Sequence, residues 1–397
     1  MQPHRPIYLD HHATTPVDAR VRDAMWPYFT EQFGNPSSKS HPYGWEADEA
    51  VAAARAHIAA LVGAEAREVV FTSGATESVN LALKGVVRPL LADGARPHVV
   101  TVATEHKATL DTAHALARRG ARETTLSVRA DGSIDKDALS RAIDDGATIV
   151  SVMHANNEIG TVHDVAAIGA LCRAREVLFH VDAAQTTGTL PIDVRAMGID
   201  LLSLTAHKMY GPKGIGALVV KRGLRLEPLV DGGGQERGHR AGTLNVPAIV
   251  GFGEAARLAL LTRDEERARI GALRDRLRAL LTDAFPDLVV HGAANDARLA
   301  GNLSIAFPFV EAERLLMRTC REVALSTGSA CTQATLEPSH VLRAIGLPHD
   351  VAHRTVRIGV GRSTTMEEIE RAAAVLIDAA RALTADSAVA QFARAGS

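Results

Sequence analysis

The sequence predicts an α/β protein in which helices cover both faces of a mostly parallel sheet, followed by a smaller α+β domain. Two observations predict this fold class. Between residues 50 and 260, short apolar stretches of strand length alternate with helical patterns. Apolar strands joined by helices are typical of parallel sheets that are buried on both faces. After Gly253 the pattern changes to a long, charge-rich amphipathic stretch and then to a mixture of short strands and helices.

The elements of the large domain follow from apolar periodicity and from glycine. Residues 50–62 are rich in alanine, a strong helix former, and Gly63 is of the type that commonly ends helices. Further helical patterns cover 77–87 and 166–175. The strand candidates are short apolar runs, and in chain order they are 68–72, 98–102, 148–153, 177–181, 201–205 and 215–220.

We place the large domain at 1–260 and the small domain at 261–397, and we expect the extreme N-terminus to pack with the small domain. A charge-rich amphipathic pattern over 254–284 predicts the helix that connects the two. The elements expected in the small domain are strands at 302–307 and 355–359, a final helix at 367–383 and a weakly ordered end at 384–397.

Composition excludes several classes of protein. Of 397 residues, 46% are hydrophobic and 23% charged, as in an ordinary globular protein. The net charge of -2 gives no reason to expect direct binding of nucleic acid or membrane. No signal-peptide core opens the chain, and no apolar run approaches the ~20 residues of a membrane span. Cys172, Cys320 and Cys331 are too few for a disulfide framework or zinc site, so we expect a reducing cytoplasm and no metal.

Ligands of open α/β sheets bind at the carboxyl ends of the strands, so the residues after each strand are informative. After the first strand, small residues and Thr76 open a helix, where backbone N–H groups suit a phosphate; simple helix capping is the alternative. His106 follows the next strand and could stack on a planar ligand or move a proton, or be structural. The loop 156–158 offers two amides and a carboxylate, which are also common in turns.

Two further strand ends carry charged side chains. Asp182 directly follows an apolar strand, where a carboxylate needs a cationic or N–H partner; a protonated pyridine nitrogen would serve, and a helix N-cap is the alternative. Lys208 follows another apolar strand, and a desolvated lysine is the amine that forms Schiff bases. An isolated lysine here would more simply lie on the surface, so its neighbours decide between a Schiff-base lysine and a surface lysine.

Together these strand ends offer a phosphate cradle, a stacking histidine, a carboxylate and an amine at one edge of the sheet. Pyridoxal phosphate needs all four: an anchor for its phosphate, a ring partner, an acid beside the ring nitrogen and an amine for its aldehyde. Their joint occurrence predicts this cofactor, although each has a simpler explanation on its own.

Cys331 lies in a segment rich in small polar residues, without periodicity, which predicts a mobile loop and an exposed thiol. By contrast Cys172 falls on an amphipathic pattern and is most simply a core residue, and Cys320 looks structural as well. Arg357 lies within the strand candidate 355–359, where it would pair with a substrate carboxylate if it faces inward and would be an ordinary surface residue otherwise.

The chain resembles the pyridoxal-phosphate-dependent cysteine desulfurases of the class V aminotransferase group, and within them the IscS/NifS-type branch. The resemblance runs nearly end to end, and the His-Lys and Gly-Ser-Ala-Cys motifs are specific in combination. The motifs that carry it are YLD at 8–10, ATTP at 13–16, FGNPSS at 33–38, FTSGATES at 71–78, TEHK at 104–107, HKMYGPKGIG at 207–216, GGGQERG at 232–238, RAGT at 240–243 and SAC at 329–331.

This resemblance implies a fold type I transferase with a seven-stranded sheet, acting as a homodimer. It implies that Lys208 binds the cofactor covalently, that His106 stacks on its ring and helps proton transfer, and that Cys331 takes the sulfur. The other residues expected at the cofactor are Ala75, Thr76, Asn157, Asp182, Gln185, Thr205, Ala206, His207 and, from the partner subunit, Thr243. The substrate carboxylate would be bound by Arg357 with Asn35, and Asn157 would lie beside the substrate.

The chain departs from the family pattern at two places near these motifs. Thr205 stands where the family often has serine, which preserves the hydroxyl. His11 and His12 replace the more usual Asn or Tyr and Ala or Ser after Asp10, and we expect no consequence for the chemistry.

The predicted reaction converts L-cysteine to L-alanine and leaves a persulfide on Cys331 for an acceptor protein. The enzymatic alternative is a selenocysteine lyase or another β-eliminating enzyme on the same scaffold, and a non-catalytic sulfur-relay scaffold is a third possibility. Iron–sulfur cluster assembly, tRNA thiolation, thiamine synthesis and DNA phosphorothioation all remain open as destinations of the sulfur.

Overall fold

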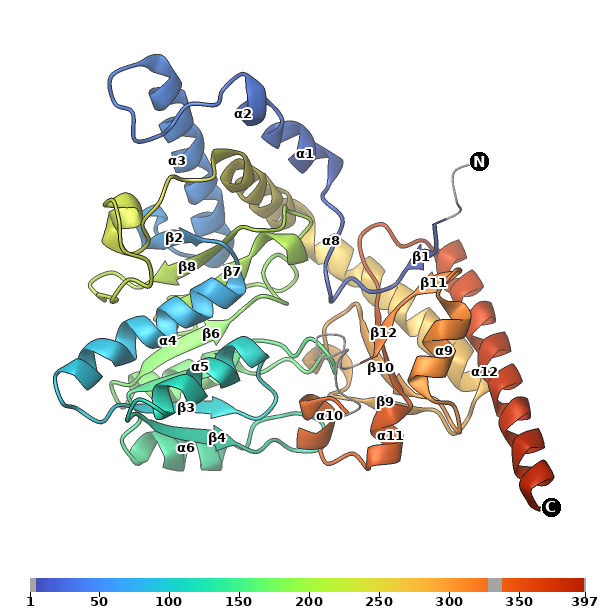
Figure 1. Ribbon diagram of the computed structural model, residues 1–397. Coiled ribbons are helices and arrows are strands. Elements are labelled where there is room, and N and C mark those ends of the chain that lie inside the picture. The colour runs from blue at the N-terminus through green and yellow to red at the C-terminus, as the bar shows by residue number, and fades with distance from the viewer. Residues whose placement is uncertain (1–4, 328–337, 396–397) are drawn as a thin grey trace.

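The computed structural model describes residues 5–327 and 338–395, and its central element is a seven-stranded sheet (Figure 1). The strands lie in the order β2-β8-β7-β6-β5-β3-β4, and all neighbours are parallel except β8, which is antiparallel to β2 and β7. Their bounds are Val69–Thr72 for β2, His98–Val102 for β3, Arg122–Leu126 for β4, Ile149–Met153 for β5, Leu178–Asp182 for β6, Leu201–Thr205 for β7 and Gly216–Val220 for β8. The predicted α/β class and mostly parallel seven-stranded sheet are confirmed.

Both faces of this sheet are buried, because successive side chains of a strand enter different cores. In β2, Val69 and Phe71 belong to one core and Val70 to the other. One face is covered by α4 (Ala75–Ala92) and α5 (Lys107–Ala117). The other carries α1 (Ala19–Met25), α3 (Pro42–Val62), α6 (Lys136–Asp144), α7 (Val165–Arg173) and the first part of α8 (Val246–Ala284), with α2 (Pro27–Thr30) beside α1.

The predicted strands of the large domain each end within one residue of an observed strand. Gly63 ends α3 in the left-handed conformation, with φ of 67°. We did not predict β4, because its sequence Arg-Glu-Thr-Thr-Leu carries a single aliphatic residue, Leu126. As the edge strand of the sheet it needs less apolar surface than its neighbours.

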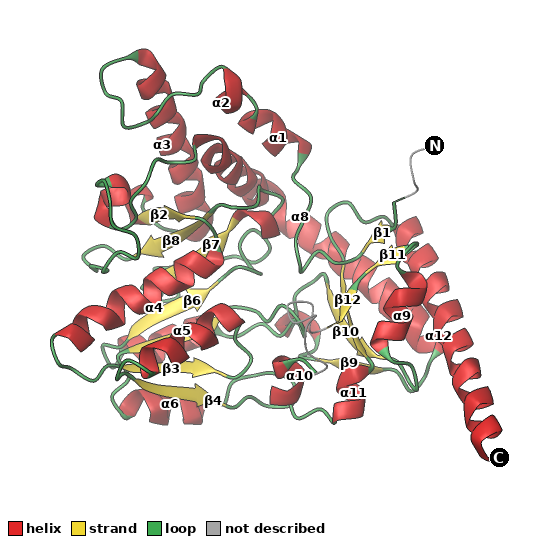
Figure 2. Cartoon of the chain, viewed as in Figure 1, coloured by secondary structure: helices red, strands yellow, loops and turns green. Residues whose placement is uncertain are grey.

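The small domain is built on a four-stranded antiparallel sheet in the order β12-β13-β10-β9 (Figure 2). Its strands are Val289–His291 (β9), Asn302–Ala306 (β10), Ser326–Thr327 (β12) and Thr355–Gly359 (β13). Its helices are α9 (Ala312–Thr319), α10 (His340–Ala344), α11 (His349–His353) and α12 (Met366–Ala395). We expected a weakly ordered end from residue 384, but α12 continues to Ala395. None of the helices in the described ranges is long and apolar enough to cross a membrane.

Two segments join the large and small cores. The long helix α8 contributes Phe252 to the core of the large sheet and Leu277 to that of the small sheet, so the boundary expected at residue 260 falls inside a helix. At the N-terminus, β1 (Ile7–Tyr8) pairs in parallel with β11 (Val323–Ala324).

The chain then crosses from the small domain to the large one. His11 N donates to Gly359 O at 3.2 Å, and Thr15 N donates to His207 O at 3.0 Å. A Cβ atom on Gly359 would lie 2.8 Å from His11 N, so only glycine permits this close approach. Residues 9–15 therefore lie between β13 and the turn that follows β7.

Candidate active site

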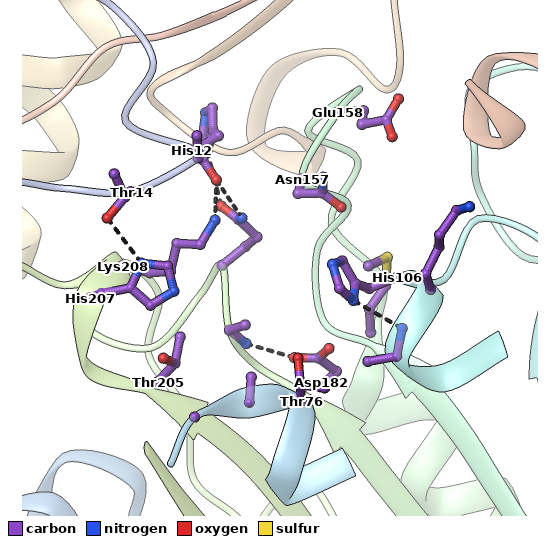
Figure 3. Close-up of a pocket in the computed structure, with 18 of the residues that line it drawn as sticks. His12, Thr14, Thr76, His106, Asn157, Glu158, Asp182, Thr205, His207 and Lys208 are labelled. Atoms are coloured by element: carbon purple, nitrogen blue, oxygen red, sulfur yellow. Dashed lines mark hydrogen bonds between the residues drawn. The ribbon is translucent and has the colours of Figure 1, made fainter. Parts of the chain in front are cut away.

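A cavity of about 680 Å³ lies where the strands of the large sheet end and the small domain begins (Figure 3). Its walls combine the N-terminal segment, the loops after β2, β3, β5, β6 and β7, and residues of β13 and α10. The predicted site residues that line it are Ala75, Thr76, His106, Asn157, Asp182, Gln185, Thr205, His207, Lys208 and Arg357. Residues spread over most of the sequence are thus brought together at the carboxyl edge of the sheet, as expected for this fold class.

The start of α4 forms a cradle for an anion at one end of this cavity. Gly74 is the N-cap, and Ala75 and Thr76 follow in the first turn. Helix N-termini present unpaired N–H groups and a partial positive charge. Gly216 of β8 lies against this turn, and a Cβ atom there would be 2.6 Å from Gly74 Cα. The close packing of two glycines therefore shapes a pocket that suits a phosphate.

His207 lies beside this cradle as a neutral imidazole. Burial, together with the charges of Lys208 and Lys213, lowers the pKa of His207 to about 4. Nδ1 of His207 is hydrogen-bonded to Oγ1 of Thr14 at 3.0 Å. When the hydroxyl of Thr14 donates, Nε2 carries the proton and is a donor for an anion.

Lys208 ends the short 3₁₀ turn η2 (Ala206–Lys208) that directly follows β7. Its side chain is half-buried and lines the cavity, and Nζ donates to the backbone oxygen of His12. The amine is therefore held at the cavity wall by a backbone acceptor. This is the position required of an amine that is to condense with an aldehyde in the cavity.

Asp182 ends β6 and is buried at 6% exposure, with the charge of Lys208 close enough to affect it. Burial raises the pKa of Asp182, while a hydrogen bond from Ala184 N and the positive charge of Lys208 act to lower it. Ala184 N binds Oδ1 at 2.9 Å, so the carboxylate also caps the turn that follows, as the simpler interpretation predicted. Oδ2 can still accept from a cationic N–H in the cavity, which fits a protonated pyridine ring.

His106 is the N-cap of α5 and lies across the cavity from Lys208 (Figure 3). Its Nδ1 accepts from Ala108 N at 3.1 Å, so Nδ1 is unprotonated and the neutral ring carries its proton on Nε2. The same hydrogen bond fixes the plane of the imidazole. A ring held in this way can stack on a planar ligand and exchange a proton through Nε2.

Arg357 is not a surface residue of an alternating strand, because it is only 4% exposed on β13. Nη2 donates to Asp10 Oδ1 at 2.8 Å and to Ser326 Oγ at 2.7 Å, and Nη1 reaches Asn157 O at 3.4 Å. Nε is buried and has no hydrogen-bond partner among the described residues. A buried guanidinium with remaining donors at a cavity is suited to binding a carboxylate.

Some of the predicted site residues do not line this cavity. Asn35 and Thr243 are exposed, and the side chain of Asn35 instead accepts from Ser37 N at 2.9 Å. Ala206 is fully buried behind the wall. Cys331 lies outside the described residues, so the structure does not test its placement.

Sequence reasoning did not single out several residues of the cavity wall. His12 and Thr14 come from the N-terminal segment, and Ser339 and His340 from the start of α10. Neither segment follows a strand of the large sheet, so the search along strand ends could not find them. The ATTP motif at 13–16 was the available signal for Thr14.

The two other cysteines differ in their surroundings. Cys172 is fully buried on α7, as expected for a core residue, and burial raises the pKa of its thiol to about 12. Cys320, which we expected to be structural, is exposed at the end of α9, where Sγ donates to Met317 O at 3.3 Å. The expectation was wrong because Cys320 lies just past the last residue of α9, three residues after the exposed Met317, whereas the buried apolar residue of that stretch is Leu315.

Comparisons with known proteins agree with this geometry. The family model described as aminotransferase class-V matches residues 7–372. A protein named cysteine desulfurase IscS, from Anaeromyxobacter sp. (strain Fw109-5), is 54% identical over 380 residues, which cover 95% of this chain and 93% of that protein.

Solved structures are similar over the same extent. A NifS-like protein superimposes with a TM-score of 0.88 at 33% identity and covers 96% of this chain and 99% of its own. A structure described as SspA in complex with cysteine has a TM-score of 0.78 at 36% identity. The match covers 90% of this chain and 100% of the SspA chain.

Glu158, in the loop that follows β5, is a buried carboxyl group in the wall of the cavity. It is 7% exposed, and its Oε2 accepts a short hydrogen bond from Ser339 Oγ. Burial raises the pKa of Glu158 to about 7, although the Ser339 hydrogen bond and the charge of Arg357 both lower it. In the unfolded chain this carboxyl group titrates near its ordinary value of 4.5. Between these two values the folded protein holds a proton that the unfolded chain has lost.

We therefore expect Glu158→Gln to change how stability depends on pH. In the wild type the free energy of unfolding should fall as pH rises from about 4.5 to about 7, and then level off. The amide of the variant does not titrate, so its free energy of unfolding lacks this fall. The difference in free energy of unfolding, variant minus wild type, should therefore increase by about 1–3 kcal/mol between pH 5 and pH 8. Urea unfolding of the apoprotein at both pH values measures the difference. Exposed Glu313→Gln is the control, and parallel curves for Glu158→Gln and wild type would show that Glu158 titrates normally.

Proposed function

Because the chain belongs to the class-V aminotransferase family and, within it, to the cysteine desulfurases, we propose that it uses pyridoxal 5'-phosphate to convert L-cysteine to L-alanine. The sulfur stays on the enzyme as a persulfide of Cys331. The observation that carries the proposal is that Lys208 and Asp182 line one cavity, the lysine half-buried and the aspartate buried, beside the N-terminus of α4.

The residues present fit this cofactor. The first turn of α4 with Thr205 and His207 would hold the phosphate, and Asp182 would hold the ring nitrogen in its protonated form. The covalent anchor would be Lys208, with His106 against the ring face and Gln185 and Asn157 on the side of its hydroxyl. When bound, the cofactor withdraws electrons from the α carbon of the substrate.

The protein's own groups supply binding and proton transfer. The amine of Lys208 would take the proton from the α carbon of the substrate, and His106 would exchange a second proton through Nε2, since its Nδ1 already accepts from Ala108 N. Arg357 would bind the substrate carboxylate through its remaining donors, since its ion pair with Asp10 at 2.8 Å already fixes the guanidinium. Asn157 would complete this side of the site.

Sulfur transfer is assigned to Cys331. Its thiolate would attack the sulfur of the substrate, so that a sulfur–sulfur bond forms and the bond between sulfur and the β carbon breaks, with the electron pair moving to carbon. The described residues on either side of 328–337 support this role. Pro338 lines the cavity, and Ser326 contacts Arg357, which also lines it.

Replacing Cys331 by serine separates cofactor binding from sulfur transfer. The variant should keep the bound cofactor and its visible absorption, while alanine formation from cysteine should fall by roughly a hundredfold or more, because a hydroxyl is a poor substitute for a thiolate. Cys320→Ser, at an exposed thiol outside the cavity, should leave turnover unchanged. Full alanine formation in the Cys331→Ser variant would refute the assignment.

The active unit is proposed to be a homodimer in which each protomer completes the site of the other. Thr243 is exposed and lies outside the cavity of its own protomer, so it could reach a phosphate only in a second copy.

A second copy also has a surface to pack on. We call the exposed aromatic residues of the N-terminal region the aromatic patch: Trp26, Phe29, Phe33, Tyr43 and Trp45. Each is more than half exposed, and they include the ring pairs Trp26–Phe29 and Phe33–Tyr43. Exposed aromatic clusters of this kind mark contact surfaces.

Charged substitutions in the aromatic patch test this assembly. We expect the double variant Phe29→Asp, Phe33→Asp to become monomeric in light-scattering measurements and to bind the cofactor more weakly, because Thr243 of the second copy is lost. Phe309→Asp, on a phenylalanine of the small domain that is more exposed than Phe29 or Phe33, should remain dimeric. A wild-type protein that is monomeric and binds the cofactor fully would contradict the proposal.

The persulfide must pass to a thiol of another protein, for which an iron–sulfur scaffold or a tRNA-thiolation relay is proposed. Such a relay requires a reduced thiol, which favours the cytoplasm. Isotopically labelled cysteine, followed into each acceptor, identifies the destination, and label that leaves only as free sulfide would exclude a protein acceptor.

A further inference from the structure

Residue 12 is a histidine that contacts two other residues of the cavity wall, through its backbone oxygen and through its ring. His12 is 9% exposed and lies in the wall of the cavity. Its backbone oxygen accepts from Nζ of Lys208 and, at 3.0 Å, from Nε2 of Gln185. Its ring nitrogen Nδ1 is 3.1 Å from Oε1 of the same glutamine. One residue thus binds both ends of the Gln185 amide and the amine of Lys208.

These contacts fix the orientation of the Gln185 amide. Nε2 must face the backbone oxygen of His12, because the opposite orientation would bring two acceptors together. Oε1 then faces Nδ1 of His12, which must carry a proton in order to donate. The second N–H on Nε2 is not used by His12. Because Gln185 lines the cavity, this N–H can donate to a ligand there.

The ring of His12 is held neutral in this tautomer. With the proton on Nδ1, Nε2 is a bare acceptor, and it is buried with no hydrogen-bond partner among the described residues. Burial, with a smaller contribution from the charges of Arg357 and Lys208, lowers the pKa of His12 to about 3, although the hydrogen bond to Gln185 acts to raise it. The Nδ1–H donor is therefore present at every pH at which the enzyme would work. A ring that does not take up a proton near neutrality is poorly suited to act as the catalytic base.

We propose that His12 is a positioning residue that locks the Gln185 amide, with its free N–H directed toward the cofactor ring, and so sets the polar surroundings of Lys208. The proposal rests on the proposed function, since it concerns the same cofactor site. It also revises the expectation that the two histidines are without consequence. His11 does not share this role, because its two ring nitrogens have no partners among the described residues and it does not line the cavity.

A double-mutant cycle between residues 12 and 185 tests the proposal. The dissociation constant of pyridoxal phosphate is measured for apoproteins carrying His12→Ala in the wild-type and in the Gln185→Ala background. We expect His12→Ala to weaken binding about threefold to tenfold in the first background, the ratio typical of one hydrogen bond. In the second background the effect should fall below about twofold, because the partner is already absent.

Two further variants serve as matched controls. His12→Asn keeps an N–H donor close to the position of Nδ1 and should restore most of the affinity, while His11→Asn should leave it unchanged. Equal effects of His12→Ala in both backgrounds, or no rescue by asparagine, would overturn the positioning role. Should the alanine variant fail to fold, His12→Ser takes its place in the cycle. Wild-type apoprotein that does not bind pyridoxal phosphate would instead refute the proposed function.

The tautomer gives a second readout that needs no cofactor. In apoprotein labelled with ¹⁵N at histidine, the signals of His12 should show protonation at Nδ1 only, unchanged between pH 6 and pH 9. Protonation at Nε2, or titration within this range, would remove the donor on which the proposal depends.

Discussion

The candidate site depends on the proximity of an amine and a carboxylate at the ends of two adjacent parallel strands. β6 ends at Asp182 and β7 at Thr205, three residues before Lys208, and the register of the pair sets Asp182 opposite Ser203. Neither charged group would be stable alone in a buried wall. Together they polarise a cavity that can hold a ring whose nitrogen is cationic and whose aldehyde needs an amine. The phosphate cradle, the stacking histidine and the buried arginine add specificity to this pair.

The N-terminal segment links that pair to the small domain. Residues 9–15 contact β13 through Gly359 on one side and the η2 turn through His207 on the other. The backbone of His12 binds Lys208, and Asp10 binds Arg357. The position of the small domain is therefore coupled through a few hydrogen bonds to the groups that would bind both cofactor and substrate. Pro338 and Ser339, at the start of the second described range, line the same cavity.

The sequence predicted the parts of the structure that depend on local pattern. Strands buried on both faces are mainly apolar, so β3 and β7 could be located to the residue. The polar edge strand β4 lacks that signal. The sequence alone favoured a surface position for Arg357, because the alternation of side chains along β13 does not reveal which face of the small sheet is buried. His12 was overlooked because its role comes from contacts made across 173 residues of sequence, through its backbone as much as its side chain. Thr243 and Asn35 lie outside the cavity of one protomer, which no local pattern could indicate.

Identifying the lysine that binds the cofactor covalently tests most directly whether Lys208, beside Asp182, forms the cofactor site. The purified holoenzyme is reduced with borohydride, which fixes a cofactor bound through a Schiff base, and the digested protein is mapped by mass spectrometry. We expect a pyridoxyl group on Lys208. A pyridoxyl group on another lysine, or a protein that carries none after incubation with pyridoxal phosphate, would contradict it.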